Sequence, residues 1–170
     1  MRLLALSSSC LLAALLAGCA GYRLGPTGGV VAGARSIQVN FFRNETLEPR
    51  LTGPITAALR KSLQQDGAYR LNTHGEGEIV VNGVITKFNR SELSFQPNDV
   101  LTVRDYSLSL IARITAVERS TGKTLLDREV SGRTTIRVGP DLSSVERQAI
   151  PLLAEDLARN VTSLLVDGDW

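Results

Sequence analysis

The sequence predicts an α/β protein of the α+β type: a two-layer sandwich with two helices on one face of a mixed, largely antiparallel sheet of about four strands. Two segments carry apolar residues at helical spacing, and between them lie several segments that alternate apolar and polar residues. Two of the alternating segments are joined by a short turn, which favours an antiparallel hairpin. Because each helix has one apolar stripe, both helices need a common partner, which one face of the sheet supplies.

The first predicted strand and the first predicted helix lie close together in the chain. Residues 37–41 alternate apolar and polar side chains, as a half-buried strand does, and a polar turn is expected over residues 42–46. An amphipathic helix follows and ends at Asp66-Gly67. Its apolar stripe recurs every four residues and consists of Leu51, Ile55, Leu59 and Leu63.

Extended chain is expected after this helix. Residues 69–71 resume an extended conformation, and residues 78–88 are rich in β-branched side chains, which favours a strand. The polar residues 89–99 contain Pro97 and are predicted to be the longest connection within the domain.

The clearest periodicity lies in residues 106–118, where apolar residues occupy every second position over a dozen residues. Residues 120–123 then turn the chain, and residues 124–138 return as a partner strand with Leu126, Val130 and Ile136 on its apolar side. The register expected for this hairpin leaves a second face without cover. That face is predicted to carry Ser107, Ser109, Arg113, Thr115, Asp127, Glu129, Ser131, Arg133, Thr135 and Arg137.

The last helix is predicted to start at a capping box formed by Ser143 and Glu146. Pro151 either kinks this helix or marks its real start, because proline lacks the N–H that a helix interior uses. Glu155 and Arg159, four residues apart, are expected to form a surface ion pair. The apolar stripe consists of Ile150, Leu153, Leu157, Val161 and either Leu164 or Leu165.

The N-terminus has the pattern of a secretory signal peptide. One positive charge, Arg2, precedes an apolar stretch over residues 10–17 that is too short to span a bilayer. The four residues 16–19, Leu-Ala-Gly-Cys, resemble the lipobox of bacterial lipoproteins, in which a peptidase cuts before the cysteine after its sulfur has received a diacylglyceryl group. The alternative is an ordinary signal peptide, cut at a small residue, with Cys19 incidental.

This resemblance divides the chain into three parts. Residues 1–18 are expected to be removed, residues 19–34 to form a lipidated cysteine and a flexible Gly-rich tether, and residues 35–170 to form a single α/β domain. Several acyl chains on Cys19 would hold the protein firmly on a membrane, whereas one chain binds only marginally. Ala20 after the cysteine, in the sorting pattern of Gram-negative lipoproteins, indicates the periplasmic side of the outer membrane.

Composition argues against several other functions. The chain has 19 basic and 17 acidic residues, and a nucleic-acid-binding protein usually shows a clear basic excess. Cys10 leaves with the signal peptide and Cys19 would carry lipid, so no disulfide within the mature chain is expected. A single histidine, His74, and no second thiol provide no zinc site, and no catalytic motif occurs. The chain is therefore expected to be no enzyme, with no metal and no cofactor.

The order of these features resembles the lipopolysaccharide-assembly lipoprotein (LptE) family. The resemblance is carried by "GYRL" directly after the Cys19-Ala20 pair, by "IQVNFFRNETLEP", by the long alternating strand with its Thr-Gly-Lys turn, and by "LAEDLARNV". It implies a lipoprotein that plugs a large outer-membrane β-barrel, assists the assembly of that barrel, and binds lipopolysaccharide. A hydrophilic sheet face suits this position, because the interiors of large barrels are polar.

Lipopolysaccharide carries phosphates and fatty chains, so its site would need fixed cations beside apolar surface. Phe88 and Phe95 are expected to supply such surface. The candidate cations are Lys87, Arg90, Arg104, Arg113, Arg133 and Arg137. The alternative is that these cations are ordinary solvated charges.

A second hypothesis for the function of this chain is a lipoprotein that regulates a periplasmic enzyme such as a peptidoglycan synthase. Outer-membrane activators of these synthases also join a lipobox to a small α/β domain, and residues 39–46 are similar to an element of theirs. The short tether favours lipopolysaccharide assembly, since a regulator that reaches across the periplasm usually has a long Pro-rich arm.

Overall fold

The computed structural model describes residues 33–139 and 141–168. The predicted signal peptide, Cys19 and nearly all of the tether lie outside the described residues. The helices are α2 (Thr52–Asp66) and α3 (Leu142–Asp167). The strands are β1 (Ser36–Val39), β2 (Arg43–Asn44), β3 (Arg70–Leu71), β4 (Ile79–Gln96), β5 (Asp99–Glu118) and β6 (Thr124–Arg137).

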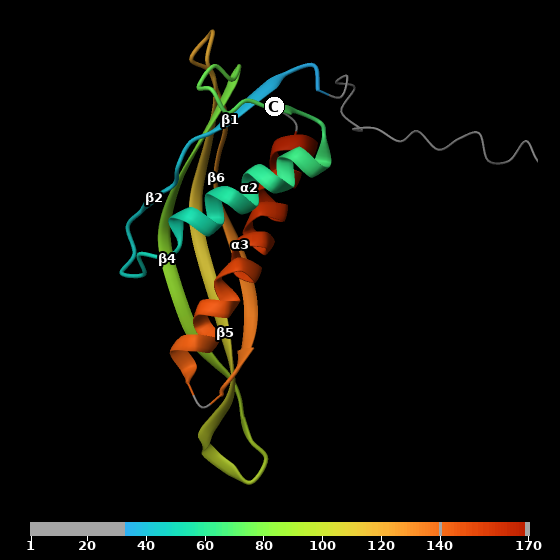
Figure 1. Ribbon diagram of the computed structural model, residues 1–170. Helices are drawn as coiled ribbons and strands as arrows, with labels where there is room; N and C mark the ends of the chain where they lie inside the picture. The colour runs from blue at the N-terminus through green and yellow to red at the C-terminus, as the bar shows by residue number, and fades with distance from the viewer. Residues whose placement is uncertain (1–32, 140, 169–170) are drawn as a thin grey trace, which may run out of the picture.

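The architecture confirms the predicted α+β class, with both helices on one face of a mixed sheet (Figure 1). The strand order is β3-β1-β4-β5-β6, and β2 pairs with β4 beyond the end of β1. Strands β1, β2 and β3 run parallel to their neighbours, whereas β4, β5 and β6 pair antiparallel. The expected number of about four strands was wrong: the sheet has six, because β2 and β3 are only two residues long and carry little periodic signal.

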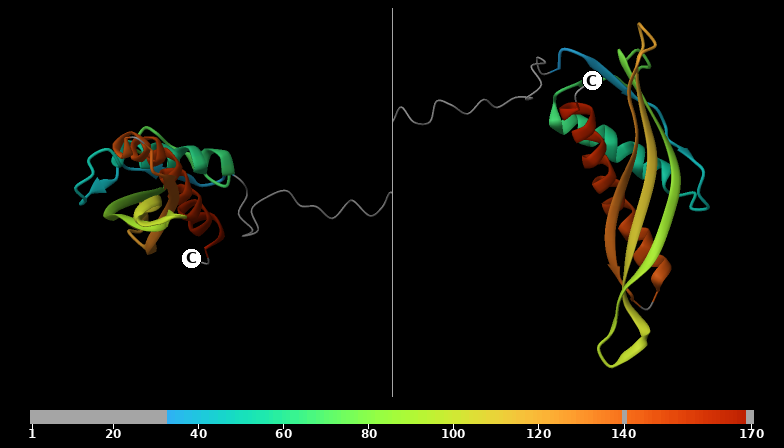
Figure 2. Two further views of the ribbon diagram at one scale, coloured as in Figure 1. Left: turned by 90° about the horizontal axis from the view of Figure 1, so that it is seen from below. Right: turned by 180° about the vertical axis from the view of Figure 1, so that it is seen from behind.

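The prediction of a long connection over residues 89–99 was also wrong. Strand β4 continues to Gln96 and β5 begins at Asp99, so only residues 97 and 98 separate them. The 18 residues of β4 span roughly 60 Å at about 3.3 Å per residue. The β4–β5 hairpin therefore extends past the helices at one end of the molecule (Figures 1 and 2). Its end, residues 93–101, is called the tip below.

The core lies between the helices and the inner face of the sheet. Every second residue of β5 from Leu108 to Ala116 is buried, as the alternation predicted, and so are the predicted apolar residues of β6. Helix α2 buries its predicted stripe and ends at Gly67, whose φ of 77° favours glycine and whose N–H donates to Leu63 O at 3.2 Å. Phe42, expected in a turn, is buried instead, with its ring over Gly83 of β4.

Helix α3 differs from its prediction at its start. The N-cap is Asp141, whose carboxylate accepts a hydrogen bond from the Ser143 N–H at 3.1 Å, so the predicted capping box of Ser143 and Glu146 was wrong. The helix runs continuously through Pro151, which therefore does not mark its start. The stripe ends on Leu165, which is fully buried, rather than on Leu164.

The ion pair predicted between Glu155 and Arg159 does not form. Glu155 lies 3.5 Å from Lys61 of helix α2, and Arg159 pairs with Asp156 at 2.8 Å. The cause is tertiary packing, since α2 and α3 lie against each other and bring Lys61 within reach of Glu155.

Candidate binding surface

The sheet face opposite the helices, here called the open face, carries the polar residues that the hairpin register predicted. Arg113 of β5 lies opposite Glu129 of β6, Ser109 lies opposite Arg133, and Asp105 lies opposite Arg137. Strand β4 extends the same rows with Asn82, Lys87 and Asn89. The residues of this face are exposed or half-buried, with the exception of Asp105. The open face is therefore a hydrophilic surface three long strands wide.

Arg113 and Asp127 neutralise each other near the middle of this face. The guanidinium donates two hydrogen bonds to the carboxylate, both at 2.7 Å. This fork raises the pKa of Arg113 and lowers the pKa of Asp127. Both side chains are exposed, so the pair contributes little to stability. It removes one of the predicted cations from the set available to an anionic ligand.

A more buried polar cluster lies at the end of the open face nearest the tip. Asp105 is only 8% exposed and accepts hydrogen bonds from the Ser94 hydroxyl at 2.5 Å, from Arg104 Nε at 2.8 Å and from Arg137 Nε at 3.1 Å. The Ser94 hydroxyl and the two guanidiniums hold the pKa of Asp105 well below its usual range. Two cations share one carboxylate here, so the cluster keeps a net positive charge.

Asp105 and Ser94 were missed in the sequence, because residues 89–99 were read as a connection and the strand was expected to start at residue 106. A signal was present, since Leu93 and Phe95, and likewise Leu101 and Val103, alternate with other side chains as strand residues do.

We expect Asp105→Asn to destabilise the protein at pH 7, because an amide cannot replace the carboxylate as the acceptor of two charged donors. The folded pKa of Asp105 is lowered, so its contribution is present above the ordinary pKa and is lost as pH falls below about 4 towards the folded pKa. The variant should therefore lose less stability than the wild type between pH 6 and pH 3. Urea unfolding at both pH values measures this difference.

The matched control is Asp127→Asn, which removes a more exposed carboxylate that pairs with one arginine instead of two. Its loss at pH 7 should be smaller than that of Asp105→Asn. Equal losses for the two variants would contradict a special role of the Asp105 cluster.

The remaining candidate cations do not share one environment. Arg90 lies on the helix side of β4, where its guanidinium pairs with Glu146 of α3 and lies 5.2 Å from the centre of the Tyr106 ring. Lys87 lies on the open face at its outer edge, and neither its amine nor the guanidinium of Arg133 has an ion pair among the described residues. Arg90 therefore holds helix α3 on the sheet, whereas Lys87 and Arg133 are available to a ligand.

Apolar side chains gather at the tip. Leu93, Phe95 and Leu101 are 57%, 42% and 88% exposed. Phe88, which was expected to lie beside the cations, packs instead against the core and is half-buried. The tip therefore combines exposed apolar side chains with the positively charged Asp105 cluster directly behind it.

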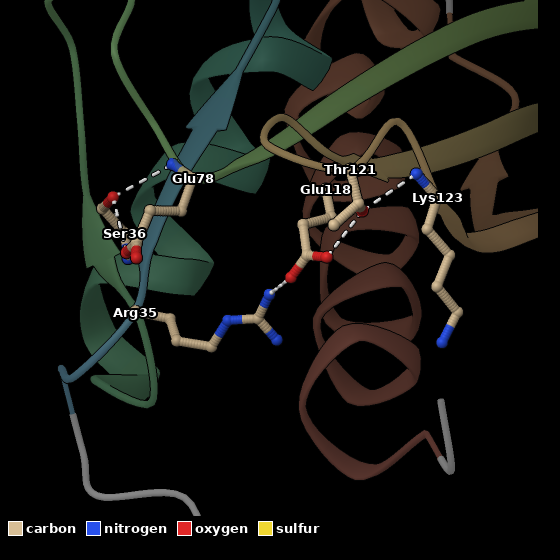
Figure 3. A network of polar contacts seen from close by, with 6 residues as sticks. All are labelled: Arg35, Ser36, Glu78, Glu118, Thr121 and Lys123. Atoms are coloured by element: carbon tan, nitrogen blue, oxygen red, sulfur yellow. Dashed lines mark hydrogen bonds and ion pairs between the residues drawn. The ribbon is translucent and has the colours of Figure 1, made fainter.

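The opposite end of the sheet holds a polar network of a different kind (Figure 3). Arg35 donates to Glu118 at 2.6 Å, and Glu118 also accepts from the Thr121 hydroxyl at 2.7 Å. Glu78 accepts hydrogen bonds from the Ser36 N–H at 2.6 Å and from the Ser36 hydroxyl at 3.0 Å, which lower its pKa. The network ties the start of β1 to β4 and to the β5–β6 turn, so it holds the first described strand of the chain in place.

Within residues 33–139 and 141–168, no group of three or more His, Cys, Asp and Glu side chains could hold a metal ion. Neither α2 nor α3 has the length and apolarity that a helix needs to cross a membrane.

Comparison with known proteins gives one family and several similar folds. The model of a family described as LptE, lipopolysaccharide-assembly, matches residues 34–165. No curated protein matches the chain. A Xanthomonas campestris protein of known structure has a TM-score of 0.59 at 9% identity and covers 86% of this chain and 92% of its own.

Two further solved structures are similar. A hypothetical protein from Chlamydia trachomatis has a TM-score of 0.58 at 12% identity, with 79% of this chain and 96% of that chain covered. A minor lipoprotein from Acinetobacter baumannii has a TM-score of 0.53 at 12% identity, with 78% and 93% covered. At such identities these likenesses concern the fold alone.

Proposed function

This chain belongs to the LptE family of lipopolysaccharide-assembly lipoproteins, and from that premise we propose that it binds and plugs the large outer-membrane β-barrel that inserts lipopolysaccharide. The match to the family model over residues 34–165 carries the proposal, because it covers both helices and all six strands nearly to the end of α3. The family is one of non-catalytic lipoproteins, so the function proposed is binding and assembly.

The open face supports this proposal physically. It is long, hydrophilic and uncovered by any described element, and the lumen of a large β-barrel is polar. A domain whose helices bury one face of the sheet and leave the other face wet is suited to such surroundings. A domain bound in lipid would instead need an apolar surface.

We further propose that lipopolysaccharide contacts the tip half of this face. Arg104 and Arg137 share one carboxylate and keep N–H donors for a phosphate, and Arg133 has no ion pair among the described residues. Leu93, Phe95 and Leu101 would lie against fatty chains. Arg113 and Arg90 are occupied by Asp127 and Glu146, so we assign them no ligand contact.

The membrane attachment is proposed at Cys19. We propose that residues 1–18 are removed, that Cys19 carries the lipid, and that the protein lies on the periplasmic side of the outer membrane. Mass spectrometry of the purified protein tests this: a diacylglyceryl mass on residue 19 is expected. An unmodified thiol, or an intact leader, would refute the anchor.

Copurification tests the partner. The tagged full chain, extracted from outer membranes in mild detergent, is expected to bring down one large β-barrel in a 1:1 ratio. Recovery of a peptidoglycan synthase without the barrel would replace the proposal with the regulatory function.

Cys19→Ala is expected to leave the domain folded but to move the chain into the aqueous phase of a detergent phase separation when the barrel is absent.

A binding experiment tests whether lipopolysaccharide contacts the tip half of the open face. Arg133→Ala combined with Arg137→Ala should weaken the binding of purified lipopolysaccharide to the lipidated chain about tenfold or more, since two charge-assisted contacts are lost. Lys61→Ala is the control, because Lys61 lies on helix α2 away from the open face. Equal affinity of the double variant and the control would reject the assigned site.

A further inference from the structure

The outer edge of β4 is only partly paired. Strand β1 pairs with residues 79–81 and β2 with residues 84 and 85, both in parallel. From Thr86 to Gln96 no described strand pairs with this edge, although β5 pairs along the other edge over the same length (Figure 1). A free edge presents a row of unpaired N–H and C=O groups, which is a template for another strand.

The other long edge of the sheet is covered. Strand β6 has α3 beside it, and the Asp156 carboxylate accepts a hydrogen bond from the Arg133 N–H at 2.9 Å. The Asn160 amide donates to the Ser131 carbonyl at 2.8 Å. Two side chains of α3 thus pair with the outer edge of β6 at residues 131 and 133. The same fold leaves the outer edge of β4 without such cover.

A hollow lies where a strand continuing the line of β2 would enter. The last backbone hydrogen bond along this edge runs from the Glu45 N–H to the Ile85 carbonyl at 3.0 Å. Directly beyond it, a hollow of about 440 Å³ is lined by residues 45–48 of the loop and residues 86–89 of β4. Leu47 of this lining is fully exposed, and Phe88 is half-buried. The hollow has room for a guest side chain against apolar surface.

The charges that line this hollow leave one cation unpaired. Glu45 pairs with Arg43 at 2.7 Å, and Glu48 pairs with Arg50 at 2.7 Å. The side-chain amine of Lys87 has no hydrogen bond or ion pair within the described part of the chain. A guest strand that placed a carboxylate beside Lys87 would complete the charge balance. Lysine on an edge also disfavours indiscriminate pairing with a second copy.

We propose that the outer edge of β4, from Thr86 to Gln96, binds an extended strand of a partner protein, with an acidic side chain beside Lys87 and an apolar side chain in the hollow. Backbone hydrogen bonds supply the affinity and the two side chains supply the selectivity, as in other cases of strand addition. The tether is a poor occupant, because residues 19–32 contain a proline and several glycines, which are depleted in strands. The proposal stands independently of which ligand the open face binds.

The test uses the full mature chain in detergent and the capped peptide Thr-Val-Thr-Val-Asp-Val-Thr-Val-Thr as the probe. Hydrogen–deuterium exchange of backbone amides is measured with and without the peptide. Slower exchange, by about threefold or more, is expected in residues 86–96, with no change in residues 128–135 of β6. A peptide with alternate amides N-methylated is the control, since it keeps the charge but cannot pair as a strand.

Charge exchange completes the test. The same peptide with Lys in place of Asp should bind about two- to fivefold more weakly, which is the range for an exposed ion pair. In Lys87→Glu this preference should reverse. Absence of protection in residues 86–96, equal effects of the N-methylated peptide, or a dimer that already protects this edge without peptide would each overturn the proposal.

Discussion

Gly132→Ala is expected to lower the free energy of unfolding by about 1–3 kcal/mol, because an added methyl group has no space between β6 and α3. A Cβ at this position would lie 2.7 Å from the Leu153 carbonyl oxygen and 2.8 Å from the Leu157 backbone nitrogen. These are backbone atoms of a helix, so they cannot turn aside as a flexible side chain would. The helix itself must move away from the sheet.

Gly53→Ala is the matched control for Gly132→Ala. Gly53 lies in the first turn of α2, and nothing lies within 4 Å of a Cβ built there. Since alanine favours a helix more than glycine does, this variant should be unchanged or more stable by up to about 1 kcal/mol. Urea unfolding measures both variants. Equal stability of the two would contradict the close approach of α3 to β6.

Leu153→Ala is expected to destabilise the protein by about 2–5 kcal/mol, the usual range for a large apolar side chain removed from a core. Leu153 is 0% exposed and belongs to the buried apolar stripe of α3. The loss combines the transfer energy of the missing methyl groups with the cavity that the neighbours do not fill.

Leu152→Ala makes the same chemical change one position earlier in the same helix. Leu152 is 56% exposed, so its removal should alter the free energy of unfolding by less than about 0.5 kcal/mol. The difference between the two variants therefore isolates burial from helix propensity. Similar losses in both, measured by urea unfolding, would show that α3 is rotated relative to the sheet.

Local patterns correctly predicted the elements in which one side faces the core, and the other faces water, along the whole length of the element. The stripe of α2, the stripe of α3 and the register between β5 and β6 were all confirmed, because each side of these elements faces either core or water throughout. The short strands β2 and β3 were not predicted, since two residues carry no period.

In the candidate site, local patterns predicted which residues lie on the open face but not which side chains pair with one another. The residues of this face between Ser107 and Arg137 were predicted individually, whereas the ion pairs and hydrogen bonds of the site were not. Pattern alone did not show that Arg90 turns to the helix side and meets Glu146, or that Asp105 gathers Arg104 and Arg137. The register shifts in β4 after Ile85 and after Glu92 change which side chains share a face, and no periodicity reports them.

Hydrophobic periodicity depends on residues that are neighbours in the chain, so the amino-acid pattern was sufficient to predict the fold class, the two amphipathic helices and the hydrophilic character of one sheet face. Three features became visible only in the folded molecule: residues 89–96 extend β4 beyond the helices, α3 lies beside one sheet edge, and the other edge stays open. Those outcomes depend on which distant segments meet. The polar end of this hairpin is extended because β4 and β5 pair with each other along it, and no local pattern reports that pairing.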